Sequence, residues 1–171
     1  MIKVYETTLP GVKKIERLLS RDHRGFYAEI YSKEAYFQNG ITIEFVEDDF
    51  SFSKKDVLRG LHGDSKTWKL VSCPFGKLYL VVVNNDPASE YFGKWEAFIL
   101  TPESRLQILI PPLYGNGHLV LSDFAMFHYK QSEYYHGQQE QFVIPWNDPR
   151  FNIPWPVENP ILSERDGGFN Q

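Results

Sequence analysis

The chain has 171 residues, of which 42% are hydrophobic, so we expect a single domain over residues 1–171 with one substantial core. Its 18 Lys and Arg residues are outnumbered by 22 Asp and Glu residues, which argues against a nucleic-acid partner. No apolar stretch resembles a signal peptide or reaches membrane-spanning length, so we expect a cytoplasmic protein with no membrane partner. The single cysteine, Cys73, excludes an intrachain disulfide and is predicted to be a buried strand residue.

Two segments near the N-terminus have helical spacing, residues 11–19 (GVKKIERLL) and residues 33–40 (KEAYFQNG), and Gly40 is a plausible helix stop. Arg-Gly-Leu at 59–61, just before His62 in RGLH, is interpreted as a tight turn. Short apolar and aromatic runs separated by turn residues predict strands at 42–48, 68–76, 77–86, 95–104, 106–112, 118–123 and 125–131. This spacing is typical of an antiparallel sandwich or barrel, so the fold is predicted to be mainly β with short peripheral helices.

The Pro-rich stretch PWNDPRFNIPWPVENP follows residue 144, and proline there blocks ladder hydrogen bonds and favours extended or turning backbone. We expect an ordered tail that wraps the sandwich and buries Trp146 and Trp155.

Five histidines are present, at positions 23, 62, 118, 128 and 136. A histidine-bearing jelly roll suggests a metal-binding cupin, but that site usually needs an H-x-H pair on one strand, and none occurs here. The sequence also lacks the glycine-rich phosphate loops and the G-x-S-x-G nucleophile elbow. We therefore predict neither a metal nor an organic cofactor.

A long ordered set of motifs resembles the dTDP-4-dehydrorhamnose 3,5-epimerase family. The set begins with DHRGFYAEIYSKEAYFQNGITIEFVEDDFSFSKKDVLRGLH and continues through KLV, FGKW, IPP, VLS, YKQSEYY, WNDP and ILSERD, covering residues 20–166. The resemblance implies a cupin-like antiparallel jelly-roll β-sandwich. It also implies a cofactor-independent epimerase and a homodimer that exchanges N-terminal strands.

Such an enzyme acts beside a 4-keto group, which acidifies the hydrogens on C3 and C5 of the sugar. The chemistry needs a base, a group that stabilises the enolate oxygen, and an acid on the opposite face. His62 is the predicted base because imidazole titrates near neutral pH. By resemblance, Asp166 in SERD orients that imidazole, although alone it would be interpreted as a surface turn residue.

The resemblance places Lys69 near the keto oxygen and makes Tyr129 the proton donor. Tyr135, six residues further along in YKQSEYY, is predicted to pack beside the sugar, and Tyr134 is the competing assignment. Without the resemblance, Lys69 would be a strand lysine with its ammonium in solvent, and the tyrosines would be core aromatics.

The nucleotide end is also assigned by resemblance. Arg24 and Arg59 match positions that bind the diphosphate, which suits the forked donors of guanidinium. Phe26 and Glu29 match residues that pack on the base and hydrogen-bond with it.

Glu47 and Asp49 in FVEDD depart from the Gln and Asn that are usual in the family. A carboxylate only accepts hydrogen bonds, and guanine presents two adjacent N–H donors, so Glu47 favours a GDP-linked over a dTDP-linked substrate. A solvated strand position is the alternative for Glu47. The GDP hypothesis agrees with a further resemblance, to GDP-linked 4-keto-heptose epimerases of bacterial capsule biosynthesis.

Asn116 in LYGNGH takes the place of a family histidine, while His118 follows two positions later. Asn cannot shuttle a proton at neutral pH. Whether His118 replaces the missing histidine stays open, as does epimerisation at C3 alone or at both C3 and C5.

The sequence thus predicts an epimerase of a nucleotide-linked 4-keto-6-deoxy sugar, with a GDP-linked heptose favoured. Two alternatives remain at this point. One is a nucleotide-sugar ketoisomerase that moves the carbonyl between C4 and C3, and the other is a jelly roll that binds sugar nucleotides without catalysis.

Overall fold

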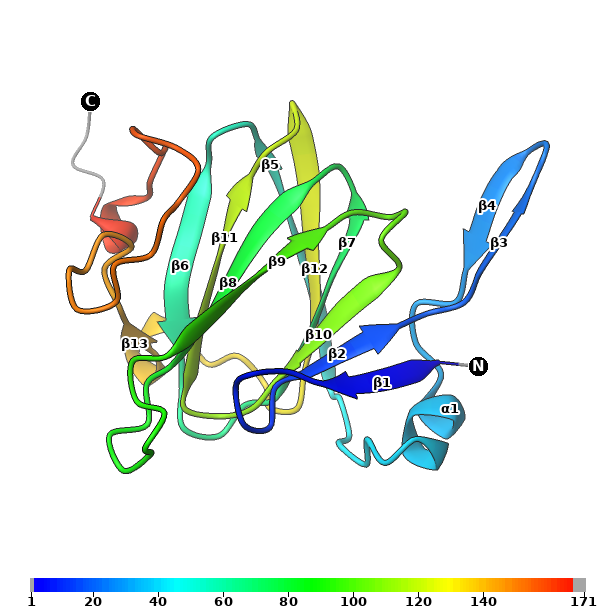
Figure 1. Ribbon diagram of the computed structural model, residues 1–171, viewed down its shortest axis with the longest axis horizontal. Helices are drawn as coiled ribbons and strands as arrows, with labels where there is room; N and C mark the ends of the chain where they lie inside the picture. Colours follow the sequence, from blue (N-terminus) through cyan, green and yellow to red (C-terminus); the bar gives the residue numbers. More distant parts are fainter. Residues whose placement is uncertain (1, 168–171) are drawn as a thin grey trace.

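The computed structural model describes residues 2–167, and nearly all of its regular structure is antiparallel β-sheet (Figure 1). The strands are β1 (Lys3–Glu6), β2 (Lys13–Glu16), β3 (Leu19–Asp22), β4 (Gly25–Ala28), β5 (Glu47–Lys54), β6 (Leu58–Gly63), β7 (Lys69–Phe75), β8 (Leu78–Asn84), β9 (Trp95–Leu100), β10 (Leu106–Ile110), β11 (Tyr114–Val120), β12 (Phe124–Gln131) and β13 (Phe142–Val143). The helices are α1 (Lys33–Gln38) and the 3-10 turns η1 (Gln138–Glu140) and η2 (Glu164–Asp166).

Two sheets face each other. One has six strands in the order β1-β2-β10-β7-β12-β5, and the other has five in the order β13-β6-β11-β8-β9. Inward-pointing residues of both sheets form the main core, which includes Val71, Cys73, Leu80, Ile108 and Phe127. The mainly β prediction and the buried position of Cys73 are confirmed.

Two further hydrophobic clusters cover the outer faces of the sheets. The C-terminal tail packs on the five-stranded sheet through Phe151 and Trp155, with Trp146 partly buried beside them, as expected for an ordered wrapping tail. Helix α1 and the segment after it pack on the six-stranded sheet through Tyr36 and Ile41. The helix prediction at 33–40 is confirmed, and Gly40 follows its end with φ of 79°.

Three local predictions were wrong. Residues 11–19 contain strand β2, because Lys13–Glu16 pairs with β1 on one side and β10 on the other while Ile15 is buried, and this pairing outweighs local helical spacing. The strand predicted at 42–48 begins only at Glu47, since Ile43 and Phe45 pack against the cluster under the six-stranded sheet. RGLH is part of strand β6 rather than a tight turn, because it pairs with β11.

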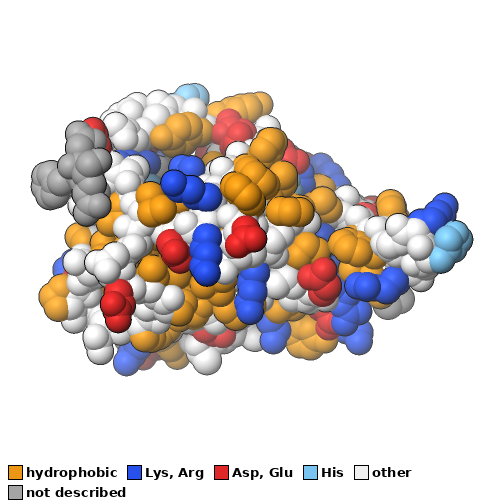
Figure 2. Space-filling model, turned by 90° about the horizontal axis from the view of Figure 1, so that it is seen from above, with side chains coloured by type: hydrophobic (Ala, Val, Ile, Leu, Met, Phe, Trp, Pro, Cys, Tyr) orange, Lys and Arg blue, Asp and Glu red, His pale blue; other side chains and the backbone are white. Residues whose placement is uncertain are grey.

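The β3–β4 hairpin projects away from the two sheets, on the side opposite the C-terminal segment (Figure 1). In the space-filling view it forms an arm with basic and histidine side chains at its tip (Figure 2). It forms a separate two-stranded sheet.

Candidate active site

His62 and Asp166 form a hydrogen-bonded pair at one wall of the sandwich. The His62 Nε2 atom lies 2.5 Å from Oδ1 of Asp166, and the other Asp166 oxygen accepts hydrogen bonds from the Gly60 amide and from Ser163 Oγ. Burial of Asp166 opposes its ionisation, but the interaction with His62 and the hydrogen bonds from Ser163 and the Gly60 amide outweigh burial and lower the pKa of Asp166. Since Nε2 faces the carboxylate, Nδ1 is the ring nitrogen left for substrate chemistry.

Gly60 explains how β6 and β11 come close enough to place His62. A Cβ atom at Gly60 would lie 2.6 Å from both the Asn116 carbonyl oxygen and the Gly117 Cα, and the φ of Gly60 is 111°. No other residue tolerates both the contact and the backbone angle. His62 therefore lies directly opposite Asn116 in the strand register.

The pair opens into a cavity of about 320 Å³ between the sheets. Eight of the residues predicted from the sequence line it: Arg59, His62, Lys69, Asn116, His118, Tyr129, Tyr135 and Asp166. These side chains come from strands β6, β7, β11 and β12, the loop after β12, and the C-terminal turn η2. The fold thus gathers residues that are spread over more than half of the chain.

Lys69 is the buried cation of this cavity, with 8% of its surface exposed. Burial lowers the pKa of its ammonium, and the nearby Asp64 opposes that effect. No acceptor within the described residues hydrogen-bonds Lys69 Nζ. A buried ammonium without a protein acceptor can stabilise negative charge that develops on a bound molecule.

Tyr129 supplies a phenol that stays protonated. Burial, reinforced by the carboxylates of Asp49 and Glu47, raises its pKa to about 12. Tyr135 also lines this cavity, whereas Tyr134 lines the neighbouring one. The geometry therefore favours Tyr129 and Tyr135 over Tyr134 as the tyrosines that meet a substrate here.

His118 and Asn116 both face the cavity, although the β6 register shifts between them. The His118 ring stacks on Phe127 at a centroid distance of 4.0 Å. Burial, followed by the charge of Arg59, lowers the pKa of His118 to about 3, so it is neutral at physiological pH. Among the described residues Asn116 Oδ1 has no hydrogen-bond partner.

The predicted nucleotide residues are not all in one place. Arg59 lines the cavity and donates from Nε to Ser53 Oγ. Arg24 and Phe26 are on the projecting hairpin, where Arg24 pairs with Asp22 at 2.6 Å, and Glu29 follows that hairpin. Within one chain the hairpin group and the His62 cavity are separate, since Arg24 and Phe26 line a hollow of their own.

Glu47 and Asp49 lie on β5 with their side chains toward Gln131. The Gln131 amide donates to both carboxylates, and the Tyr135 backbone amide also donates to Glu47. Burial and the adjacent Glu47 raise the pKa of Asp49. The two carboxyl groups thus hold Gln131 and Tyr135 in place beside the cavity.

Comparison with known proteins gives a clear relationship. The family model described as dTDP-4-dehydrorhamnose 3,5-epimerase matches residues 6–171. The chain belongs to this family. It is therefore an epimerase that acts on sugar nucleotides, which favours catalysis over the reading as a non-catalytic binding protein.

The similarity of this epimerase to its relatives extends over nearly the whole chain. The dTDP-4-dehydrorhamnose 3,5-epimerase of Shigella flexneri is 38% identical, covering 96% of this chain and 93% of that protein. The Legionella pneumophila enzyme in complex with dTDP-4-keto-L-rhamnose superposes with a TM-score of 0.91 at 38% identity, covering 98% of this chain and 90% of that one. The jelly-roll prediction is confirmed by this match.

A more distant solved structure is a 3'-monoepimerase. The Streptomyces bikiniensis enzyme, in complex with dTDP-quinovose, has a TM-score of 0.87 at 26% identity, covering 94% of this chain and 83% of that one. Relatives of this epimerase thus include a protein named as an epimerase of one carbon, C3, as well as proteins named as epimerases of both C3 and C5.

Several cavity residues of this epimerase were not predicted: Ser51, Phe127, Gln131, Gln141, Ser163 and Arg165. Strand alternation could have found Phe127 and Gln131, because they lie two residues on either side of Tyr129. Arg165 is in the SERD motif beside Asp166. No sequence signal marked Gln141.

Within residues 2–167, no group of three or more His, Cys, Asp or Glu side chains is arranged to hold a metal ion. In the same part of the chain no helix has the length and apolar character needed to cross a bilayer.

Proposed function

We propose that this epimerase inverts C3 of a nucleoside-diphosphate 4-keto-6-deoxy sugar. The observation that carries the proposal is one cavity that holds a carboxylate-paired histidine, a buried ammonium and a protonated tyrosine. His62 and Tyr129 are on opposing sheets, which suits removal of a proton from one face of a sugar ring and return to the other.

In the proposed mechanism, Nδ1 of His62 takes the proton from C3. The electron pair of the broken C–H bond forms a C3–C4 double bond, and negative charge moves to the C4 oxygen beside Lys69. The Tyr129 hydroxyl then donates its proton to C3 from the opposite face, and the ketone re-forms. Proton exchange with water resets the imidazolium and the tyrosinate.

The role of His118 follows from its pKa. A histidine whose pKa is about 3 is uncharged at neutral pH, and the N–H of a neutral imidazole is a very weak acid, so His118 is proposed to shape the cavity rather than act as an acid. His62 and Tyr129 would then serve every proton transfer. Whether C5 is also inverted is left to product analysis.

The nucleotide is a separate part of the proposal. Relatives of about 38% identity are named for dTDP sugars, and this supports a dTDP-linked substrate. A GDP-linked heptose is the second candidate, and it rests on Glu47 and Asp49. Their contacts weaken it, since Glu47 already accepts hydrogen bonds from Gln131 and from the Tyr135 amide, and Asp49 accepts one from Gln131.

We further propose a homodimer in which the hairpin of one subunit completes the site of the other. Arg24 and Phe26 lie on an arm that projects from its own subunit (Figure 1). In addition, β5 is an edge strand with Phe50 and Phe52 more than half exposed. An exposed edge and an exposed aromatic patch are features that association covers.

The test is product analysis with a dTDP-linked and a GDP-linked 4-keto-6-deoxyhexose in separate reactions. After reduction with sodium borodeuteride, NMR assigns the configuration at C3 and C5, and the deuterium marks the carbon that held the carbonyl. Inversion at C3 supports the proposal. A carbonyl moved to C3 would identify a ketoisomerase, and binding of dTDP or GDP without turnover would identify a binding protein.

Calorimetry with dTDP and GDP then decides the nucleotide. Tighter binding of dTDP is expected. A clear preference for GDP would instead support recognition of guanine by the Glu47 carboxylate.

A further inference from the structure

Two buried side-chain polar atoms lack a hydrogen-bond partner among the described residues, Asn116 Oδ1 and Ser51 Oγ. Both residues line the cavity that contains His62. In folded proteins the large majority of buried side-chain polar atoms are paired. Two unpaired atoms at one cavity therefore favour a bound molecule that supplies their partners.

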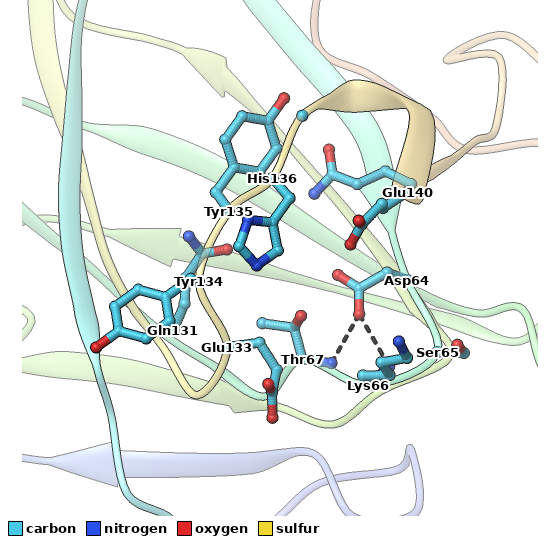
Figure 3. Close-up of a pocket in the computed structure, with 12 residues that line it drawn as sticks. Asp64, Ser65, Lys66, Thr67, Gln131, Glu133, Tyr134, Tyr135, His136 and Glu140 are labelled. Carbon is cyan, nitrogen blue, oxygen red and sulfur yellow. Dashed lines mark hydrogen bonds between the residues drawn. The ribbon is translucent and has the colours of Figure 1, made fainter.

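The neighbouring cavity shows a different pattern. It has a volume of about 520 Å³, and Asp64 on its wall accepts hydrogen bonds from the backbone amides of Lys66 and Thr67 (Figure 3). Neither of the two unpaired atoms belongs to a residue that lines this second cavity. The unmet hydrogen bonds thus mark the His62 cavity.

The backbone of Asn116 is held in place on both sides. Strand β11 pairs with β6 on one side and with β8 on the other, so Asn116 lies opposite His62 and opposite Val82. Only 8% of Asn116 is exposed. The sheet thus fixes the residue at the cavity wall and leaves its amide oxygen free for a ligand.

Asn116 is also the neighbour of the proposed base. Directly opposite residues of antiparallel strands have Cβ atoms about 4.5–5.5 Å apart and side chains on the same face of the sheet. The Asn116 amide is therefore close to the His62 imidazole. A substrate group that contacts this amide is on, or next to, the carbon that loses its hydrogen to His62.

The two carbons that flank the ketone differ in what they offer the Asn116 oxygen. C3 carries a hydroxyl, which can donate a hydrogen bond. C5 carries the ring oxygen and a deoxy carbon, and neither of these donates. With C3 at His62 the Asn116 oxygen gains a donor, whereas with C5 there it stays buried and unpaired, which is unfavourable.

We propose that Asn116 is a specificity-determining residue, which accepts a hydrogen bond from the C3 hydroxyl and thereby directs His62 to C3 rather than to C5. The inference rests on the proposed function, from which it takes the base and the 4-keto sugar, and it adds the choice of carbon. Asparagine suits this role, because its amide carries no charge and its oxygen accepts a hydrogen bond.

The test measures incorporation of solvent deuterium at C3 and C5 for three sugars on the same nucleoside diphosphate. These are a 4-keto-6-deoxyhexose, its 3-deoxy analogue and its 2-deoxy analogue. With the first sugar, the wild type is expected to exchange C3 at least about tenfold faster than C5, in line with the cost of an unpaired buried acceptor. Asn116→Ala is expected to lower this C3-to-C5 ratio by about tenfold.

The deoxy sugars separate a contact to the C3 hydroxyl from a structural role of Asn116. With the 3-deoxy sugar, Asn116→Ala should change kcat/KM for exchange at C3 by less than about twofold, because the partner of the amide is already absent. With the 2-deoxy sugar the full loss should persist. A residue that only holds a water molecule or the strand would affect all three sugars alike.

Two further variants complete the comparison. Asn116→Asp keeps an acceptor in nearly the same volume and should retain the C3 preference even where the rate falls. Ser51→Ala is the control, because it removes the other unpaired atom, which belongs to β5 in the opposite sheet, and it should leave the C3-to-C5 ratio unchanged. Binding of the free nucleoside diphosphate shows that each variant is folded.

The outcomes separate this inference from the proposed function. Equal exchange at C3 and C5 in the wild type would overturn it while epimerisation stands. An Asn116→Ala effect that persists with the 3-deoxy sugar would do the same, and one that disappears with the 2-deoxy sugar would assign Asn116 to the C2 hydroxyl instead.

If the wild type binds the sugars but exchanges neither carbon, the proposed function fails and dissociation constants decide the contact. The contact stands if Asn116→Ala weakens binding of the parent and 2-deoxy sugars several-fold but not of the 3-deoxy sugar. Equal changes for all three sugars would reject the contact as well.

Discussion

The Oδ1 atom of Asp166 lies 2.5 Å from Nε2 of His62, although 104 residues separate them in the chain. The carboxylate is nearly buried, with 3% of its side chain exposed, whereas 21% of the His62 side chain remains exposed at the cavity. The buried partner thus orients the imidazole, and the exposed partner can meet a substrate.

The first prediction concerns this pair. Asp166→Asn should lower kcat by about 100- to 10,000-fold, because the amide cannot stabilise an imidazolium and a general base contributes on that scale. Initial rates and the dissociation constant of dTDP are the measurements. Ser163→Ala removes only a hydrogen bond to Asp166 and should cost much less. Turnover of Asp166→Asn within threefold of the wild type would remove the pair from the mechanism.

The second prediction concerns alkaline pH. Burial lowers the pKa of Lys69 from its usual 10.5, while the pKa of Tyr129 is raised to about 12. As pH rises, Lys69 therefore loses its charge before Tyr129 loses its proton, and kcat/KM should fall. Lys69→Arg should shift that fall upward, because guanidinium stays charged. Rate profiles from pH 7 to 10.5 measure this, and an unmoved fall would mean that another group titrates.

The third prediction concerns stability in mild acid. The pKa of His118 is about 3 in the folded protein and 6.5 ordinarily, so the unfolded chain binds the extra proton between these values. Stability contributed by neutral His118 is therefore present above pH 6.5 and is lost as pH falls toward 3. Between pH 7 and pH 5 the loss is about 2 kcal/mol.

His118→Phe should remove about that much of the difference in free energy of unfolding between pH 7 and pH 5, measured by denaturant titration at fixed protein concentration. His23→Gln is the matched control, because His23 is exposed at the hairpin tip. An acid sensitivity that survives His118→Phe would mean that other groups cause it.

The fourth prediction concerns the exchanged hairpin. Arg24→Ala should raise KM about tenfold or more, since in the proposed dimer Arg24 makes a charge-assisted contact to the diphosphate in the partner's site. A mixture of Arg24→Ala and His62→Asn subunits, refolded together, should regain activity at low substrate concentration. In a mixed dimer, the site of the Arg24→Ala subunit keeps its own His62 and receives the hairpin with an intact Arg24 from the His62→Asn subunit. Mixing without any gain would show that the hairpin does not complete a neighbouring site.

The sequence predicted the sheet-forming segments best where short apolar and aromatic runs lie between turn residues, as in β7, β8 and β12. It mispredicted Lys13–Glu16 as helical. This segment is a strand because it pairs with β1 and β10, and the local sequence does not reveal that pairing. Strand β6 was also misread, because Gly60 resembles a turn residue unless its contact with Asn116 is known.

For the site, family motifs led to His62, Lys69, Tyr129 and Asp166, and the fold brings them around one cavity. The environment of each group could not be predicted. Burial decides that His118 is neutral, and only the folded chain shows that Glu47 already holds Gln131 and Tyr135.

Incorporation of solvent deuterium tests the central claim most directly. The protein is incubated in deuterated water with a dTDP-linked 4-keto-6-deoxyhexose, and C3 and C5 are followed by NMR and mass spectrometry. The account predicts deuterium at C3 with the wild type and none with His62→Asn. Exchange that persists at the wild-type rate in His62→Asn, or no exchange at C3 in the wild type while nucleotide still binds, would contradict it.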